Sequence, residues 1–452
     1  MGHDHAVVVG ASMGGLAAAA ELSRHFSHVT VLERDKIVDE LDFRRGVPQA
    51  RHAHALLEVG QRAWNDWFPG FTDALISDGA VRIDMSAARF WLQGGYLARE
   101  DRPERPLCSM SRPLVEAVAR RHVKARANVE FRVGVAARGV RVVGDRVTGV
   151  DLEHDGEQTA VESDLVVDCT GRASRTLRWI ESLGFPVPPV SQVFVNVTYA
   201  SRVLRRAPDD IDGSLAAIVD TPPGRRAAAL FPLEHDRWIC GVVGINGEAV
   251  PTDDVGFLDF AETLPAPDIA HVIRKQEALT PVAVHRFPSS QRRHFEKLGK
   301  LPLGLVALGD SMCSFNPIYG QGMAVAALQA QALGQTLNDH PSSTAEFGRV
   351  YYKRSAAALS VPWQFAAGGD FQWPGTTGAR PRGIGVSNRY AARITRAGHR
   401  NGKVADRFFL VQQLLAPPTA LMSPSMMWNA WRFGRKTDNG QSAFSLRPGG
   451  SP

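Results

Sequence analysis

"HAVVVGASMGGLAAAAELSRHFSHVTVLERD", residues 5–35, contains an apolar run, a glycine-rich turn, a helical pattern, a second apolar run and an acid. This order predicts a strand, a helix and a parallel strand, the βαβ unit of a Rossmann-like domain. Gly10 would make the tight turn, and Gly15 would let the helix pack closely on the strand. Ser12 departs from the second glycine of the dinucleotide fingerprint. Glu33 ends the unit, where a carboxylate can accept hydrogen bonds from a ribose.

The composition is that of a soluble globular protein: 452 residues, 44% apolar and 22% charged. The net charge of +6 is scattered along the chain, which favours small anionic ligands over nucleic acid. The four cysteines form no CxxC pair, so we expect reduced thiols in a cytoplasmic protein. The N-terminus lacks a signal architecture, and no apolar stretch approaches the roughly 20 residues of a membrane span.

Later segments change pattern in a way that indicates domains. Short, mixed strand patterns from about residue 190 to 284 predict an antiparallel sheet, and the chain turns helical after Ala324. We therefore expect an α/β fold: a Rossmann-like dinucleotide-binding domain, an antiparallel-sheet substrate domain and a helical C-terminal region. The expected segments are 1–185 and 286–345 for the first domain, 186–285 for the second, and 346–452 for the helical region.

A second glycine-bearing turn, "LGDSMCSFNPIYGQGM" (Leu308–Met323), also joins a strand pattern to a helix pattern. It resembles the GD motif of the flavoprotein monooxygenases typified by para-hydroxybenzoate hydroxylase, a family that this chain resembles over most of residues 5–345. The resemblance implies that Gly309 and Asp310 hold the ribityl chain of FAD. A flat ring also needs neighbouring backbone without Cβ atoms. The residues expected to border the flavin ring are Pro317, Gly320, Gln321, Gly322 and Met323.

Two other segments extend the resemblance. "DLVVDCTGRAS" (Asp164–Ser174) is similar to the family's mid-chain motif, with Gly171 in the glycine position but Thr170 in place of the aspartate. "RRGVPQARHAH" (Arg44–His54) resembles bacterial epoxidases that oxidise polyene precursors of polyether ionophores. In this segment we expect Arg45, in preference to Arg44, to contact FAD. The full set of further expected cofactor contacts is Met13, Gly14, Arg34, Arg44, Arg45, Gln49, Arg112, Val135, Asp168 and Gly171.

The pair His52 and His54 has the spacing of two metal ligands, but no third ligand cluster is near. We expect local hydrogen bonds or packing for both rings and no metal site.

The resemblance implies oxygen chemistry carried by the cofactor. NADH or NADPH would reduce FAD, dioxygen would be captured as a C4a-hydroperoxide, and one oxygen atom would enter the substrate. Because only one nucleotide fingerprint is present, the nicotinamide would bind transiently, or a separate flavin reductase would supply electrons. No base stands out in the predicted sheet, which favours epoxidation of an alkene over hydroxylation of an aromatic.

The expected substrate is a lipophilic polyketide, terpenoid or aromatic molecule of secondary metabolism or antibiotic biosynthesis. Phe194, Phe231 and Trp238 are candidates for the pocket wall, with core packing as the alternative. The aromatic segments Val361–Gly375 and Arg407–Phe433 fit ordinary helix packing, a substrate entrance or contact with a membrane surface.

The same motifs bear on other functions. A flavin-dependent halogenase is disfavoured because the chain has no WxWxIP segment. A double-bond reductase or dehydrogenase of the prenyl-reductase type stays open, as does a non-catalytic flavin-binding protein. The GD motif argues against a dehydrogenase that uses NAD without flavin.

Overall fold

The computed structural model describes residues 3–37, 41, 43–44, 46–100 and 102–435. Its first sheet is parallel, with strand order β17-β11-β1-β2-β7. The expected βαβ unit is confirmed, since β1 and β2 are parallel neighbours joined by α1. The bounds are β1 His3–Val9, α1 Met13–Leu22, β2 Phe26–Glu33, β7 Val129–Val133, β11 Leu165–Asp168 and β17 Leu305–Ala307.

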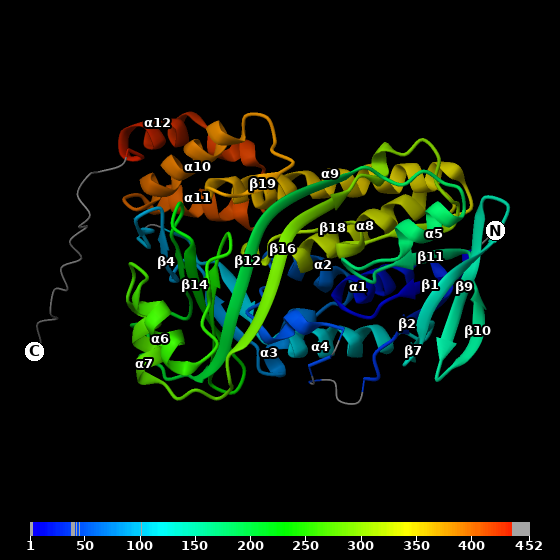
Figure 1. Ribbon diagram of the computed structural model, residues 1–452, viewed down its shortest axis with the longest axis horizontal. Helices are drawn as coiled ribbons and strands as arrows, with labels where there is room; N and C mark the ends of the chain where they lie inside the picture. Colours follow the sequence, from blue (N-terminus) through cyan, green and yellow to red (C-terminus); the bar gives the residue numbers. More distant parts are fainter. Residues whose placement is uncertain (1–2, 38–40, 42, 45, 101, 436–452) are drawn as a thin grey trace, which may run out of the picture.

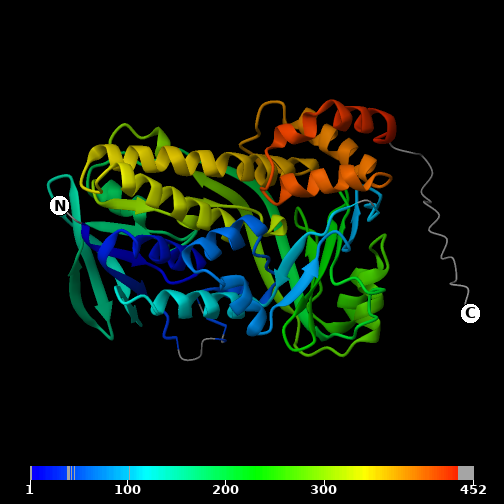
Figure 2. The ribbon, with the colours of Figure 1, turned by 180° about the vertical axis from the view of Figure 1, so that it is seen from behind.

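Helices cover this sheet and bury its strands. The side chains of Ala6, Val7 and Val8 in β1 are fully buried, as expected for a parallel sheet covered on both faces. Helix α1 contacts α4 on one side and α8 on the other, and Figure 2 shows α1 and α4 side by side. Ser111 caps α4, because its hydroxyl accepts a hydrogen bond from the Leu114 amide. The helices are α2 Glu58–Trp67, α3 Phe71–Ser77, α4 Arg112–Lys124, α5 Thr176–Ser182, α8 Gly322–Asp339 and α9 Ala345–Gly369.

The second sheet has nine strands in the order β18-β16-β12-β15-β14-β13-β4-β5, with β19 paired to β12. All pairs are antiparallel except β13 with β4. In Figure 1, β12 and β16 of this second sheet run as long curved ribbons from beside α8 and α9 toward α6 and α7. The strands are β4 Arg89–Leu92, β5 Gly95–Tyr96, β12 Val190–Arg205, β13 Ala217–Asp220, β14 Arg226–Leu233, β15 Arg237–Gly244, β16 Ala283–Arg293, β18 Cys313–Ser314 and β19 Thr377–Gly378.

The remaining elements flank the two sheets. A three-stranded sheet comprises β8 Ala136–Val143, β9 Arg146–His154 and β10 Glu157–Glu162, and a two-stranded sheet comprises β3 Val81–Asp84 and β6 Pro106–Ser109. The other helices are α6 Asp254–Glu262, α7 Asp268–Lys275, α10 Ile384–Gly398, α11 Gly402–Gln412 and α12 Pro424–Phe433. The short 3-10 helices are η1 Pro48–Arg51, η2 Phe295–Lys297, η3 Gly309–Ser311, η4 Pro317–Tyr319, η5 Asp370–Gln372 and η6 Pro418–Met422.

The expected fold class is confirmed: a parallel α/β sheet, a second and largely antiparallel sheet, and C-terminal helices. The exact domain boundaries stay a prediction. At two places, however, strands cross the expected boundaries. Strand β16 runs across residue 285, and the β4-β5 pair from the first segment joins the second sheet. Within the described ranges, no helix combines the length and apolarity that crossing a membrane requires.

Candidate functional site

The first glycine turn, between β1 and α1, leaves no room for larger residues. Gly10 has a φ of +102°, and a Cβ there would lie 2.8 Å from the carbonyl oxygen of Cys169. A Cβ on Gly15 would overlap the carbonyl oxygen of Gly10, whereas Gly14 has ordinary space around it. The hydroxyl of Ser12 does not cap α1. Amides at the α1 N-terminus are therefore available to an anion, as a dinucleotide diphosphate requires.

The second glycine turn meets the first across the edge of the sheet. A Cβ on Gly309, which has a φ of +68°, would lie 4.0 Å from the Cα atom of Gly14. The third turn joins them, because the Gly171 amide donates to the Ser311 hydroxyl at 2.9 Å. Parallel strands end at the same edge, which explains why three turns so distant in sequence converge. The structure thus brings the two motifs singled out in the sequence together.

Asp310 is the acidic residue of the second turn. Its surface is exposed, while its neighbours Gly309 and Ser311 are buried. Asp310 nevertheless lies in a dense part of the protein, and the resulting loss of hydration raises the pKa of its carboxyl, a rise that Arg112 and Arg172 oppose. A carboxylate so placed, between buried neighbours and open to solvent itself, suits a polyol chain that needs a fixed acceptor.

Two arginines behind this turn, the buried Arg293 and the half-buried Arg172, were not predicted. Arg293 donates to the carbonyl oxygens of Ser311 and Arg172, and Arg172 donates to the Ser314 hydroxyl at 2.8 Å. Arg293 therefore fixes the backbone next to Asp310, and Arg172 ties the third turn to β16 and β18. Neither arginine lies in a pattern that would have indicated this role.

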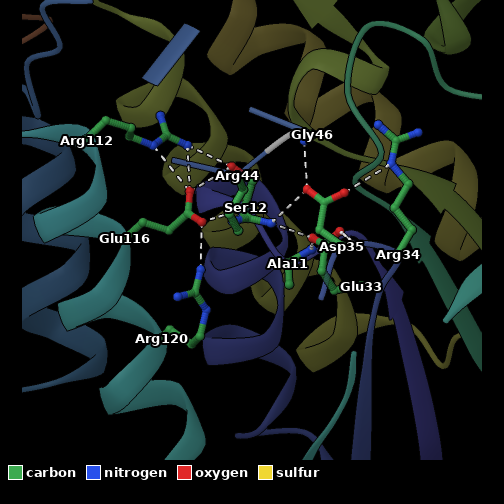
Figure 3. A network of polar contacts seen from close by, with 10 residues as sticks. All are labelled: Ala11, Ser12, Glu33, Arg34, Asp35, Arg44, Gly46, Arg112, Glu116 and Arg120. Carbon is green, nitrogen blue, oxygen red and sulfur yellow. Dashed lines mark hydrogen bonds and ion pairs between the residues drawn. The ribbon is translucent and has the colours of Figure 1, made fainter. Parts of the chain in front are cut away.

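Figure 3 shows the polar network beside the first turn. Glu33 accepts hydrogen bonds from the Ala11 amide at 3.0 Å and from Arg44 at 2.9 Å. Glu116 on α4 accepts from Arg44 and Arg112, and from Arg120 at 2.7 Å. Burial alone would raise the pKa of Glu116, but the three guanidinium groups outweigh it and hold the pKa below its ordinary value. Glu116 is thus the anion that holds Arg44 and Arg112 together.

Arg112 links this network to the glycine turn. It donates to the Ser12 hydroxyl at 2.7 Å, and Ser12 donates to Glu116 at 3.1 Å. The guanidinium groups of Arg112 and Arg44 therefore lie where a diphosphate on α1 would need cations. Glu33 lies at the end of β2 as expected, although Arg44 already engages its carboxylate.

Other predicted residues have varied surroundings. Asp168 is fully buried, and its carboxylate accepts hydrogen bonds from Thr170, Ser174 and Thr176, so it shapes the turn that carries Gly171. The Arg34 side chain is 71% exposed. Arg45 lies outside the described residues. Met13 and Met323 are buried, and Gln49 is half-buried in η1. The Val135 amide donates to the Glu33 carbonyl, and Pro317 begins η4. Gly320 has a φ of +66°, and a Cβ on Gly171 or Gly322 would meet nothing within 4 Å.

A buried acid, Asp370, lies close to the residues expected to border the flavin ring. Asn316 donates to Asp370 at 2.8 Å, Tyr199 donates to Asn316 at 2.8 Å, and Tyr319 donates to Asp370 at 3.3 Å. Asp370 is fully buried, and this burial raises its pKa to about 7. Burial also raises the pKa of Asp220 to about 7, and the Asp220 Oδ1 atom has no hydrogen-bond partner among the described residues. These two acids are candidate bases near the sheet that the sequence did not single out, and whether either acts as a base stays a prediction.

Of the two histidines, His52 contacts residues distant in sequence and His54 makes a local hydrogen bond. His52 Nδ1 lies 2.9 Å from the Ser201 hydroxyl, and its ring centroid is 5.7 Å from that of His285. Burial, first of all, lowers the pKa of His52 to about 4, so the ring is neutral at pH 7. His54 Nδ1 lies 2.9 Å from the His52 carbonyl oxygen.

One pocket candidate is wrong. Trp238 is buried in a cluster with residues of α6 and α7, and it donates to Asp210. Side chains alternate along β15, so Trp238 lies on the face of the sheet opposite Val243, which clusters with Tyr199. Phe231 is half-buried and Phe194 is 39% exposed; their role in a pocket stays a prediction.

Comparison with known proteins shows which class of protein shares this fold. No family model matches the chain. PqsL of Pseudomonas aeruginosa, described as a probable FAD-dependent monooxygenase, superposes with a TM-score of 0.59 at 17% identity, over 82% of this chain and 99% of PqsL. The p-nitrophenol 4-monooxygenase PnpA of Pseudomonas putida superposes with a TM-score of 0.63 at 16% identity, over 92% and 100% of the two chains. The fold is therefore that of the FAD-dependent monooxygenases.

Sequence comparison adds the family. Protein Rv3254 of Mycobacterium tuberculosis is 31% identical over 387 residues, which are 82% of this chain and 81% of that protein. The chain belongs to the family of Rv3254. Digeranylgeranylglycerophospholipid reductase 2 of Methanococcoides burtonii is 27% identical over 180 residues, 39% of this chain and 40% of that reductase.

Proposed function

We propose that this protein is an FAD-dependent monooxygenase that inserts one oxygen atom into a lipophilic small molecule. The observation that carries this proposal is the meeting of the two glycine turns, with a Gly309 Cβ position 4.0 Å from the Gly14 Cα atom. One elongated cofactor can then contact the α1 N-terminus with its diphosphate and Asp310 with its ribityl chain. The fold shared with flavin monooxygenases supports the same assignment.

The residues of the chain would bind and orient the cofactor. The α1 amides, Arg112 and Arg44 would hold the diphosphate, and Gly320 and Gly322 would leave space for the ring. FAD, once reduced by NADH or NADPH, supplies the activation of dioxygen. The protein would position the substrate and exclude water around it.

The acids near the sheet help to distinguish an alkene substrate from a phenolic one. The resemblance of residues 44–54 to polyene epoxidases favours an alkene, which needs no base. Asp370, reached through Asn316 from Tyr199, favours a phenolic substrate, because a carboxylate near its pKa can accept a hydroxyl proton. Epoxidation of an alkene remains our first proposal, and aromatic hydroxylation is the second candidate that this network supports.

The test is product analysis under isotopically labelled dioxygen. The purified protein would be supplied with NADPH or NADH and with panels of lipophilic alkenes and phenols. We expect one labelled oxygen atom in the product, as an epoxide or as a new hydroxyl group. A saturated, unlabelled product formed without oxygen consumption would instead show a double-bond reductase, the alternative to which the partial similarity to the archaeal lipid reductase points.

The cofactor site has a separate test in Asp310→Ala. Loss of a hydrogen bond to a charged group costs about 1.5–3 kcal/mol, so we expect FAD affinity to fall roughly 10- to 100-fold. The ratio of flavin to protein absorbance after purification measures this. Asp145→Ala removes an exposed acid paired with Lys300 and should leave the ratio unchanged. Stoichiometric FAD in Asp310→Ala would contradict the proposed ribityl contact.

A further inference from the structure

Helix α12 exposes an apolar surface at the outer edge of the molecule. Trp428 and Trp431 are 56% and 53% exposed, and their ring centroids lie 5.2 Å apart. Met427 on the same helix and Met422 just before it are exposed as well. Large apolar side chains are normally exposed singly, so a group of four marks an interaction surface. Figure 1 shows α12 beyond α10 and α11, far from the first sheet.

The opposite side of α12 is already used for packing. Met426 and Ala430 are buried in a cluster with Ile394 and Ala397 of α10. The helix is therefore apolar on two sides, and only one side has a partner among the described residues. The exposed tryptophans are not needed for the core of the helical region.

The region that carries α12 is strongly basic. Residues 376–435 contain ten Lys and Arg residues and a single acid, Asp406, whereas the net charge of the whole chain is only +6. Asp406 is itself paired with Arg105 from another segment. Residues 376–435 thus carry more net positive charge than the whole chain, so the expectation of evenly scattered charge is wrong for the helices around the exposed tryptophans.

Several arginines border the apolar surface directly. The Arg435 guanidinium lies 5.9 Å from the Trp431 ring centroid, and Arg432 follows Trp431 in the helix. Arg396 of α10 donates to the Gly434 carbonyl oxygen at the end of α12, next to the backbone of Arg393. Within the described residues, no acidic side chain forms an ion pair with any of these four arginines.

We propose that this surface, formed by Met422, Met427, Trp428, Trp431, Arg432 and Arg435, docks on an anionic lipid bilayer. Tryptophan rings favour the boundary between headgroups and acyl chains, and arginines beside them attract anionic headgroups. The two exposed methionines add apolar volume without a stacking face, which favours acyl chains over nucleobases. Docking would place the enzyme beside a reservoir of lipophilic molecules, but the inference does not depend on FAD or on monooxygenase activity.

The experiment is co-sedimentation with lipid vesicles. The full-length protein would be incubated with phosphatidylcholine vesicles, with and without phosphatidylglycerol, at low and high salt. We expect binding only when phosphatidylglycerol is present and weaker binding at high salt. The double variant Trp428→Ser/Trp431→Ser should bind at least about tenfold more weakly, as should Arg432→Glu/Arg435→Glu.

A matched control and a fold check keep the test decisive. Val255→Ser changes a 72% exposed apolar residue on α6 and should bind like the natural sequence. Circular dichroism would confirm that every variant is folded. The proposal is overturned if the protein ignores anionic vesicles, or if the folded tryptophan variant binds them equally well. It is also overturned if these tryptophans instead support binding of a single-stranded oligonucleotide or self-association without vesicle binding.

Discussion

At the scale of single residues, Asp370 couples the candidate site to pH. Burial raises its pKa from 3.8 to about 7, so the folded protein binds a proton that the unfolded chain has already released in this interval. The free energy of unfolding should therefore fall as the pH rises from about 4 to about 7, by up to about 4 kcal/mol from this group. The nearby Asp220 carboxyl titrates with it, because the two acids interact.

The variant Asp370→Asn tests this assignment. It keeps an oxygen that can accept from Asn316 but cannot ionise. We expect the variant to gain stability over the natural protein as the pH rises from 4 to 8, with most of the change complete near pH 7. Urea unfolding at several pH values measures the difference in unfolding free energy between variant and natural protein. For the control Asp145→Asn, this difference should not change with pH. A difference between Asp370→Asn and the natural protein that does not change with pH would show that Asp370 is ionised throughout.

At the scale of elements, two adjacent glycines of the first turn should respond very differently to alanine. Gly15→Ala forces a Cβ into the Gly10 carbonyl oxygen and should push α1 away from β1, at a cost of more than about 3 kcal/mol. At Gly14 the nearest atoms would lie 3.7 and 3.9 Å away, and alanine is the better helix former by about 1 kcal/mol. Thermal unfolding of the two variants should therefore differ by several degrees, with Gly14→Ala close to the natural protein. Equal midpoints would contradict the tight turn.

The elements also explain what the sequence could predict. The βαβ unit was predictable because Gly10, Gly15 and the apolar runs around them act within one short segment. The pairing of β4 with β13 was not, since the partners of a parallel pair can lie anywhere along the chain. The network around Asp370 was missed for the same reason: Asp370 belongs to no recognisable motif, and its partner Asn316, in the second glycine turn, is 54 residues away. Trp238 was misplaced because alternation alone does not tell which face of a sheet is covered by helices.

At the scale of the whole molecule, the proposed cofactor would span turns that begin and end the first domain. Intact FAD should then stabilise the protein more than the two halves of FAD, FMN and AMP, can. Only the intact dinucleotide engages both turns at once, so that binding at one turn raises the effective concentration of the other half at the second turn. A ligand at 100 times its dissociation constant adds about 2.7 kcal/mol, or a shift of a few degrees in a protein of this size.

Thermal unfolding of the flavin-free protein with FAD, FMN, AMP, or FMN and AMP together measures this linkage. We expect FAD at a given concentration to raise the midpoint by more than FMN and AMP combined. The Arg112→Ala variant should lose most of the shift produced by FAD, because Arg112 lies against Ser12 at the first turn. Arg138→Ala, which removes an exposed arginine paired with Glu153, should keep the full shift. If AMP alone reproduced the effect of FAD, the second turn would have no part in binding, and the two glycine turns would meet for structural reasons only.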